Sequence, residues 1–152
     1  MKRWVVFAVM LIIVFIPGII GGLFTTDAVR SDWYLQNRPP FTPPNYVFPI
    51  VWSILYFLIA LSLYFCWMNA DKKGKKNVAI VFGINLLANA LWSILFFGLE
   101  NALLAFIDLV LIWITIIVMI FVAGKIDKKS AWFLLPYLLW VSFAGFLHWA
   151  FL

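Results

Sequence analysis

Charged side chains are scarce in this sequence. Only 11% of the 152 residues are Asp, Glu, Lys or Arg, whereas 66% are hydrophobic, and the mean hydropathy is +1.08. A soluble domain of this length has too little interior to hide so much apolar surface from water. The composition therefore excludes an ordinary soluble domain and indicates that the surrounding solvent is lipid.

Cysteine and histidine are nearly absent as well, with one residue of each. A lone Cys66 excludes a disulfide framework and a Cys-x-x-Cys motif, and we interpret it as a small core residue. A single histidine cannot build a zinc site, so we expect no metal. Two interpretations of His148 stay open: a ligand of haem iron, or a hydrogen-bonded core histidine.

The apolar residues form five long runs that charges separate, and only Asp108 interrupts one of them. Each run supplies the ~20 apolar residues that a spanning helix needs. We therefore expect an all-α membrane protein, a single domain over residues 1–152 built as a five-transmembrane-helix bundle. The first run is too long for the apolar region of a typical signal peptide, so we expect it to remain as a helix. The expected helices cover about residues 4–22, 46–69, 77–98, 102–124 and 131–152.

The basic residues are unevenly placed along the chain, whose formal net charge is +5. If the five helices alternate in direction, nine Lys and Arg residues lie on one side of the membrane and only Arg30 and Arg38 lie on the other. This asymmetry is a positive-inside signature, and it predicts a cell-membrane protein with a cytoplasmic N-terminus and an external C-terminus. Because the basic residues flank apolar spans, we expect no nucleic-acid partner.

The only long connection, residues 23–47, joins the first two expected helices. We expect a short helix that begins at Thr26 or Asp27, since either residue can cap it. Prolines exclude a helix interior further on, because proline lacks an N–H group and has a fixed φ. The aromatic residues among them are too apolar to stay solvated, so we expect an ordered lid over residues 33–44. The prolines of the lid are Pro39, Pro40, Pro43 and Pro44.

Polar and aromatic side chains converge on the half of the membrane beneath this lid. Trp52 begins the second helix on that side, and Asn89 and Trp92 end the third. Asp108 lies about 9 Å into the fourth helix at 1.5 Å per residue, a depth at which a carboxylate must face the interior, a partner or water. We favour a structural partner over catalysis, because no second carboxylate lies in the spans. The arrangement predicts an aromatic pocket for a small hydrophobic ligand.

Small residues spaced four apart occur on two expected helices. Gly18 and Gly22 form one pair, and Ala79 and Gly83 form another. Such pairs let helix backbones approach closely, either inside the bundle or between two chains. We expect a homodimer through one of these faces.

The motifs resemble those of the TspO/translocator-protein family, and they follow the family order along nearly the whole chain. Three residues depart from the usual pattern: Phe41 stands where Trp is common, Asn85 where Gln is common, and His148 where Asn is common. The matching residues are Trp33-Tyr34, Arg38-Pro39, Pro43-Pro44, Phe48, Trp52, Leu55-Tyr56, Asn85, Asn89, Trp92-Ser93, Phe96-Phe97, Asp108, Pro136-Tyr137, Trp140, Phe143-Ala144 and Leu147.

The resemblance implies a five-helix bundle, often a homodimer, with a ligand pocket beneath the first loop. It implies a membrane receptor, sensor or carrier for hydrophobic planar ligands: porphyrins such as protoporphyrin IX or haem, sterols, and benzodiazepine-type drugs. Some bacterial members degrade protoporphyrin IX in light and oxygen, and Trp52 and Trp140 match the tryptophans implicated as catalytic. The alternative function is therefore a porphyrin-degrading enzyme. No cofactor is required in either case.

Two groups of residues are expected at the site. The lid and its structural partners are Trp33, Arg38, Pro39, Pro43, Pro44 and Asp108. The ligand-binding residues are Tyr34, Phe48, Trp52, Tyr56, Asn89, Trp92, Phe96, Trp140, Phe143, Ala144 and Leu147.

Structural interpretations of the same residues remain open. The tryptophans could stack on a ligand or pack between helices. Asn85 and Asn89 could bind a ligand or hydrogen-bond across helices. Arg38 could pair with porphyrin propionates, or it could fix the lid by bonding Asp27, Asp32 or loop carbonyls. A packing or regulatory subunit with no ligand of its own is a third possible function.

Overall fold

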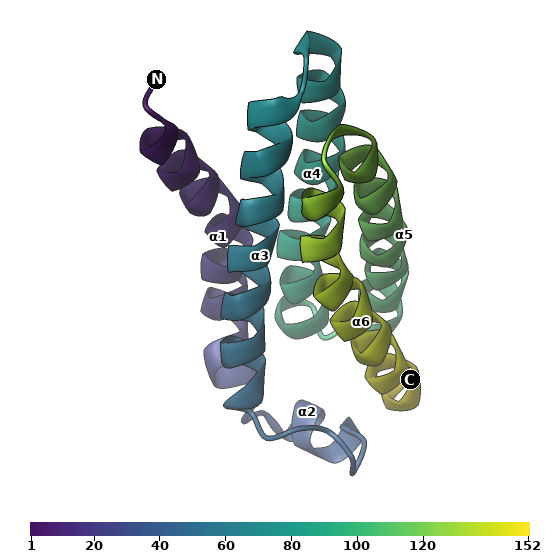
Figure 1. Cartoon of the computed structure of the whole chain (residues 1–152). Helices are drawn as coiled ribbons and strands as arrows, with labels where there is room; N and C mark the ends of the chain where they lie inside the picture. Colours follow the sequence, from purple (N-terminus) through teal and green to yellow (C-terminus); the bar gives the residue numbers. More distant parts are fainter.

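The computed structural model describes residues 1–152 and contains helices but no strands (Figure 1). Five long helices stand side by side, and one short helix, α2, lies across one end. The helices are α1 (Arg3–Ala28), α2 (Asp32–Asn37), α3 (Val47–Asn69), α4 (Lys72–Ser93), the π-helical turn η1 (Ile94–Gly98), α5 (Ala102–Ile126) and α6 (Lys128–Phe151).

All five long helices have the length and apolar composition of membrane spans. The most extensive contacts join α5 to both α4 and α6, and α3 to both α1 and α6. Their interface is filled by a single apolar core in which Val14, Ile59 and Ile116 have no exposed surface. The predicted fold class, an all-α bundle of five membrane-spanning helices, is confirmed.

The first helix is longer than the sequence predicts. It continues through Gly21 and Gly22 to Ala28, and the hydroxyls of Thr25 and Thr26 donate to the carbonyl oxygens of Gly21 and Gly22 at 2.7 and 2.8 Å. The two glycines therefore do not end the helix. Gly21 serves close packing instead, because a Cβ at this position would lie 2.8 Å from Ser93 Oγ. The expected short helix is present as α2, but it begins at Asp32 and is capped by Ser31, not by Thr26 or Asp27.

Three other long helices, α4, α5 and α6, begin or end beyond the ranges expected from their apolar runs, whereas α3 matches its expected range. α4 starts at Lys72 rather than near residue 77, because the Asp71 side chain accepts a hydrogen bond from Gly74 N at 2.7 Å and caps it. α6 starts at Lys128, where Asp127 accepts from Lys129 N. Hydropathy marks the membrane-embedded part of a helix, whereas capping residues set where the helix begins.

The connection between α1 and α3 is ordered, as expected. Ser31 caps α2 by accepting a hydrogen bond from Tyr34 N at 3.2 Å. The chain then turns at Pro39, which is buried and whose carbonyl oxygen accepts from both the amide and the hydroxyl of Thr42. The residues between Arg38 and Tyr46 form turns and extended chain, in agreement with the proline argument.

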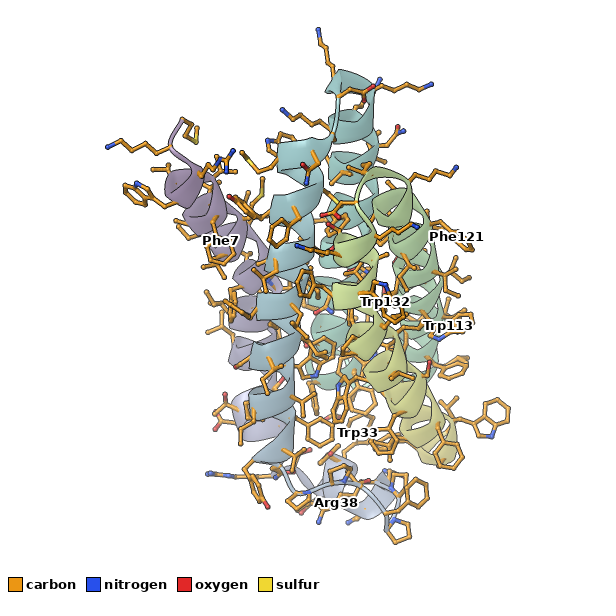
Figure 2. All side chains as sticks on the ribbon, in the orientation of Figure 1. Phe7, Trp33, Arg38, Trp113, Phe121 and Trp132 are labelled. Carbon is orange, nitrogen blue, oxygen red and sulfur yellow. The ribbon has the colours of Figure 1, made fainter.

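The two ends of the bundle differ in charge. The N-terminus, the α3–α4 turn and the α5–α6 turn lie at one end, opposite α2 (Figure 1). These segments carry nine of the eleven Lys and Arg residues, and Figure 2 shows nitrogen-tipped side chains extending from this end. The labelled Arg38 lies at the other end, beside α2.

The glycine pair of α1 is used inside the bundle. A Cβ at Gly18 would lie 2.6 Å from Cε2 of Tyr56 on α3, so this glycine admits the tyrosine ring. No atom lies within 4 Å of a Cβ placed at Gly22 or at Gly83. The contact at Gly18 is therefore intramolecular, whereas Gly22 and, on the α4 face, Gly83 have no neighbour within the chain.

We expect Gly18→Ala to lower the free energy of unfolding by about 1–3 kcal/mol, because the added methyl group overpacks against a ring that cannot retreat. Gly22→Ala is the matched control and should be neutral or stabilising by up to about 1 kcal/mol, since alanine favours helix and meets no neighbour there. Unfolding of both variants in mixed micelles measures the difference. Equal stability of the two variants would contradict the packing of Gly18 on Tyr56.

Candidate functional site

A continuous series of buried hydrogen bonds runs across the centre of the bundle; we call it the polar ladder. Each member donates to the next. The Tyr56 hydroxyl donates to Asn89 Oδ1 at 2.8 Å, and Asn89 Nδ2 donates to the Tyr137 hydroxyl at 3.1 Å. Tyr137 in turn donates to Asn85 Oδ1 at 2.9 Å, and Asn85 Nδ2 donates to Thr115 Oγ1 at 2.9 Å. The ladder joins α3, α4, α6 and α5.

The ladder gives both asparagines hydrogen-bond partners within the protein. Asn85 is fully buried and bonds across helices, which is the structural interpretation that the sequence left open. Asn89, expected to bind ligand, has both its amide oxygen and its amide nitrogen bonded within the protein. Tyr56, also expected at the ligand, gives its hydroxyl to the ladder and its ring to Gly18. These two side chains are therefore part of the core in this structure.

Aromatic side chains fill the end of the bundle beneath α2. Phe96 is their centre: its ring centroid lies 5.2 Å from Trp33, 6.4 Å from Tyr34 and 5.0 Å from Phe151. Tyr34 is buried, and burial raises the pKa of its phenol while Arg38 opposes the shift. The phenol is neutral near pH 7. Trp33 and Tyr34 thus join α2 to the end of the helix that η1 completes.

The π-helical turn η1 sets the positions of these rings. Leu99 N donates to the Ile94 carbonyl oxygen at 2.9 Å, a wider turn than in an α-helix. Trp92 and Phe96 stack with centroids 4.8 Å apart and planes 11° from parallel. Glu100, which follows the turn, has a φ of 49°, in the left-handed region. π-helical turns are often found at functional sites.

Four buried polar atoms in this half of the bundle have no hydrogen-bond partner. They are Trp92 Nε1, Asp108 Oδ2, Trp140 Nε1 and His148 Nδ1. An unpaired buried polar group costs about 1–3 kcal/mol, so such atoms are expected to meet water or a ligand. The two indole nitrogens are hydrogen-bond donors. The carboxylate oxygen is an acceptor, and so is the histidine nitrogen, for the reason given in the next paragraph.

His148 is held by its other ring nitrogen. Nε2 lies 2.8 Å from the carbonyl oxygen of Ala102, and because a carbonyl only accepts, Nε2 carries the proton and Nδ1 is left as an acceptor. The ring also packs edge-on against Trp92, Phe96 and Phe106. His148 is therefore a hydrogen-bonded core histidine with one unused nitrogen.

Asp108 faces the bundle interior, as its depth predicts, and is only 5% exposed. The structural partner expected in the loop or the third helix is absent, since no side chain or backbone group hydrogen-bonds to Oδ2. The prediction of a partner from within the chain was wrong. The helix places the carboxylate correctly, but no donor of the neighbouring helices reaches it.

An open apolar groove of about 420 Å³ lies between α3 and α6; we call it the α3–α6 groove. Two expected ligand-binding residues, Trp140 and Phe143, line it, and Phe48 packs edge-on against Trp140 with centroids 5.8 Å apart. The groove differs from the enclosed pocket that the sequence predicts. Its lining residues are Val51, Ile54, Leu55, Pro136, Leu139, Trp140 and Phe143.

The remaining expected residues are spread around these features. Trp52 is half-buried and packs against Tyr56 and Tyr137, with centroids 5.4 and 6.1 Å away. On α6, Ala144 is half-buried and Leu147 is buried. The structure brings Phe48, Trp140 and Phe143 together at the groove, whereas Trp92 and Phe96 lie in the aromatic cluster under α2.

The lid residues are unequal in their contacts. Pro39 is buried, Pro43 is half-buried and Pro44 is exposed. Arg38 is exposed and forms no ion pair or side-chain hydrogen bond, so the expected bond to Asp27, Asp32 or a loop carbonyl is absent. The lid is fastened instead by aromatic contacts, including the stack of Phe41 on Phe146 with centroids 5.4 Å apart.

Sequence reasoning gave no role to Tyr137, although this residue accepts one ladder bond and donates the next. Its signal was present, because a tyrosine three residues before Trp140 lies on the same helix face. Phe151 was missed because it lies at the very end of the last helix.

No group of three or more metal-ligating side chains is found in the chain.

Five apolar helices, a short helix across one end and a groove walled by tryptophan and phenylalanine define a tryptophan-rich membrane protein. The sequence pattern of the TspO/MBR family matches residues 6–152. The chain therefore belongs to the TspO/MBR family of membrane sensor and receptor proteins. The resemblance inferred from its motifs is confirmed.

Individual relatives support this assignment. The chain is 40% identical to a tryptophan-rich protein TspO of Archaeoglobus fulgidus over 137 residues, which are 88% of this chain and 86% of that one. It is 28% identical over 142 residues to a tryptophan-rich sensory protein of Cereibacter sphaeroides, covering 93% and 85% of the two chains. A translocator protein of Ovis aries is 28% identical over 134 residues, covering 84% and 79%.

We expect Tyr137→Phe to lower the free energy of unfolding by about 1–3 kcal/mol, because it leaves Asn89 Nδ2 and Asn85 Oδ1 without partners. Tyr64→Phe is a matched control, since Tyr64 is half-buried in α3 and its hydroxyl bonds to no protein group. Unfolding in mixed micelles measures both. A loss no greater than that of the control would contradict the role of the polar ladder.

Proposed function

We propose that this protein is a membrane receptor or sensor for hydrophobic planar ligands, with porphyrins such as protoporphyrin IX as the leading class. The observation that carries the proposal is the α3–α6 groove, where Trp140 lines an apolar hollow of about 420 Å³ and its buried Nε1 has no partner. Ligand sites combine an apolar wall with a few placed polar groups, and the groove supplies the apolar wall.

The groove suits a flat apolar ring. Trp140 and Phe143 supply aromatic faces, and Val51, Ile54 and Leu139 supply aliphatic walls. Because both bordering helices are membrane spans, a ligand dissolved in lipid reaches the groove without crossing water. An acceptor on the ligand would satisfy the indole N–H of Trp140 and remove the cost of leaving it unpaired.

Arg38 supports a ligand that carries carboxylates. Its guanidinium is exposed at the α2 end and has no partner in the chain (Figure 2). Guanidinium groups pair with carboxylates through two parallel hydrogen bonds. With the lid-fixing role absent, pairing of Arg38 with porphyrin propionates is the interpretation we propose. Sterol- or benzodiazepine-type ligands lack such groups and would use the apolar wall alone.

Orientation and assembly complete the proposal. We infer that the basic end faces the cytoplasm of a cell membrane and that the α2 end and C-terminus lie outside, following the charge asymmetry. We also propose a homodimer through α4, where Ala79 is exposed and Gly83 is uncovered.

We expect wild-type protein in micelles to bind protoporphyrin IX saturably and Trp140→Phe to weaken the affinity about three- to tenfold, because phenylalanine keeps an aromatic face but lacks the N–H donor. The shift of the porphyrin Soret band measures binding, since tryptophan fluorescence would change with the substitution itself. Phe143→Ala should weaken binding as well, because it removes an aromatic ring from the wall of the groove.

The matched control is Trp132→Phe, the same substitution on the same helix at a residue that is 70% exposed and does not line the groove. Its affinity should equal that of the wild type. Equal loss in Trp132→Phe and Trp140→Phe would contradict a site at the groove. No saturable binding by the wild type would favour a packing or regulatory subunit without a ligand.

The alternative function is light- and oxygen-dependent degradation of a bound porphyrin. It is favoured by the contact of Trp52 with Tyr56 and Tyr137, which forms a series of oxidisable rings on α3 and α6, the two helices that border the groove. In this reaction the porphyrin absorbs light, molecular oxygen is the oxidant, and the porphyrin ring is oxidised. Trp52 and Trp140 would exchange electrons with the excited ring.

Illumination of the complex in air decides this alternative. If the protein degrades porphyrin, the Soret band should bleach at least several-fold faster than with free porphyrin in empty micelles, and Trp52→Phe should slow the bleaching without weakening binding. Bleaching that continues at the same rate under nitrogen, or that matches free porphyrin, would rule out the enzymatic function while leaving the receptor proposal intact.

A further inference from the structure

A second cavity, of about 250 Å³, lies at the basic end of the bundle, far from the α3–α6 groove; we call it the basic cavity. It is formed where the first turns of α4 meet the last turns of α5. Two lysines, an aspartate and an asparagine contribute to its wall, together with Gly74 and two apolar residues of α5. The lining residues are Asp71, Lys73, Gly74, Asn77, Val122, Lys125 and Ile126.

The two lysines of the basic cavity are not neutralised by the protein. Neither Lys73 nor Lys125 has a carboxylate within 4.0 Å. Two other lysines at this end rest on aromatic rings instead: Lys75 Nζ lies 5.6 Å from the Trp67 ring centre, and Lys129 Nζ lies 6.0 Å from that of Phe65. Lys73 on α4 and Lys125 on α5 are therefore both free to bind the same anion.

The acidic residues at this end are already engaged. Asp71 lines the basic cavity, but its Oδ1 accepts from Gly74 N at 2.7 Å as the cap of α4. Asp127 accepts from Lys129 N and from the Ser130 hydroxyl as the cap of α6. Both carboxylates are held by helix capping, and these two acids face nine Lys and Arg residues at this end, so positive charge remains in excess.

The position of the basic cavity beside lipid-facing residues favours an anion that carries acyl chains. Val122 and Ile126 line its apolar part, and deeper residues of the same two helices, Ile80, Ile84 and Val118, are between 41% and 49% exposed. Exposed apolar residues on membrane spans face lipid tails. An anion with acyl chains can place its charge on the lysines and its chains along these helices.

We propose that the basic cavity binds the headgroup phosphate of an anionic phospholipid from the adjoining leaflet. Lys73 and Lys125 contact the phosphate, Asn77 supplies a hydrogen-bond donor, and the acyl chains lie against α4 and α5. Basic recesses between membrane helices are suited to anionic headgroups, and each basic residue near the surface adds to the attraction. The site is independent of the proposed porphyrin function.

The test uses the full-length protein in neutral detergent micelles, titrated with phosphatidylglycerol or phosphatidylcholine while thermal unfolding is followed. The wild type should be stabilised saturably by phosphatidylglycerol and not by phosphatidylcholine. Lys73→Gln combined with Lys125→Gln should need about tenfold more phosphatidylglycerol for the same shift. Native mass spectrometry should show fewer retained anionic lipids in this variant.

The matched control is Lys72→Gln combined with Lys128→Gln, which removes the same charge from exposed lysines that do not line the basic cavity. This control should keep the affinity of the wild type. An equal loss in both double variants would show that attraction is spread over the surface and would overturn the site. Equal stabilisation by the two lipids would also overturn it.

A third titration separates a lipid from a free anion. Inorganic phosphate carries the same charged group without acyl chains, and at equal concentration it should stabilise the wild type far less than phosphatidylglycerol does. If phosphate alone produces the full shift, the lipid assignment is wrong and the basic cavity is a site for a soluble anion.

Discussion

The polar ladder from Tyr56 through Asn89, Tyr137 and Asn85 to Thr115 is the interaction on which the bundle depends. In lipid, apolar contact alone gives helices little reason to choose one partner or one register, because the tails are as apolar as the side chains. A series of directed bonds across four helices fixes both. Successive side chains of the ladder are joined by single hydrogen bonds. Displacement of one helix would therefore leave buried donors and acceptors without partners.

The ladder also restricts where ligand chemistry can occur. The amides at the centre of the bundle are bonded to the protein, so the remaining capacity lies in the indoles of Trp92 and Trp140, in Asp108 and in His148. These unpaired atoms lower the stability of the folded protein, and they lie in the half of the bundle beneath α2. A ligand or water that satisfied them would recover part of that stability, which is the physical link between the core and the proposed binding function.

The two ends of the molecule treat charge in different ways. At the α2 end, aromatic packing fastens the lid, and Arg38 remains free. At the opposite end, the carboxylates of Asp71 and Asp127 cap helices, and lysines remain in excess around the basic cavity. Unpaired cations thus remain at both ends: Arg38, suited to a ligand carboxylate, and Lys73 with Lys125, suited to a lipid phosphate.

The sequence by itself determined the number of helices, the uneven charge of the two ends and the ordered lid, because hydropathy, lysine placement and proline geometry are local properties. Only the tertiary structure showed that α1 continues through Gly21, where the missing side chain lets Ser93 approach the helix. It likewise decided that Asn89 belongs to the core while Trp140 lines a groove. Helical spacing places both residues on inward faces. Whether the polar atoms of each residue meet a hydrogen-bond partner depends on the side chains of the neighbouring helices, which the sequence of one helix does not specify.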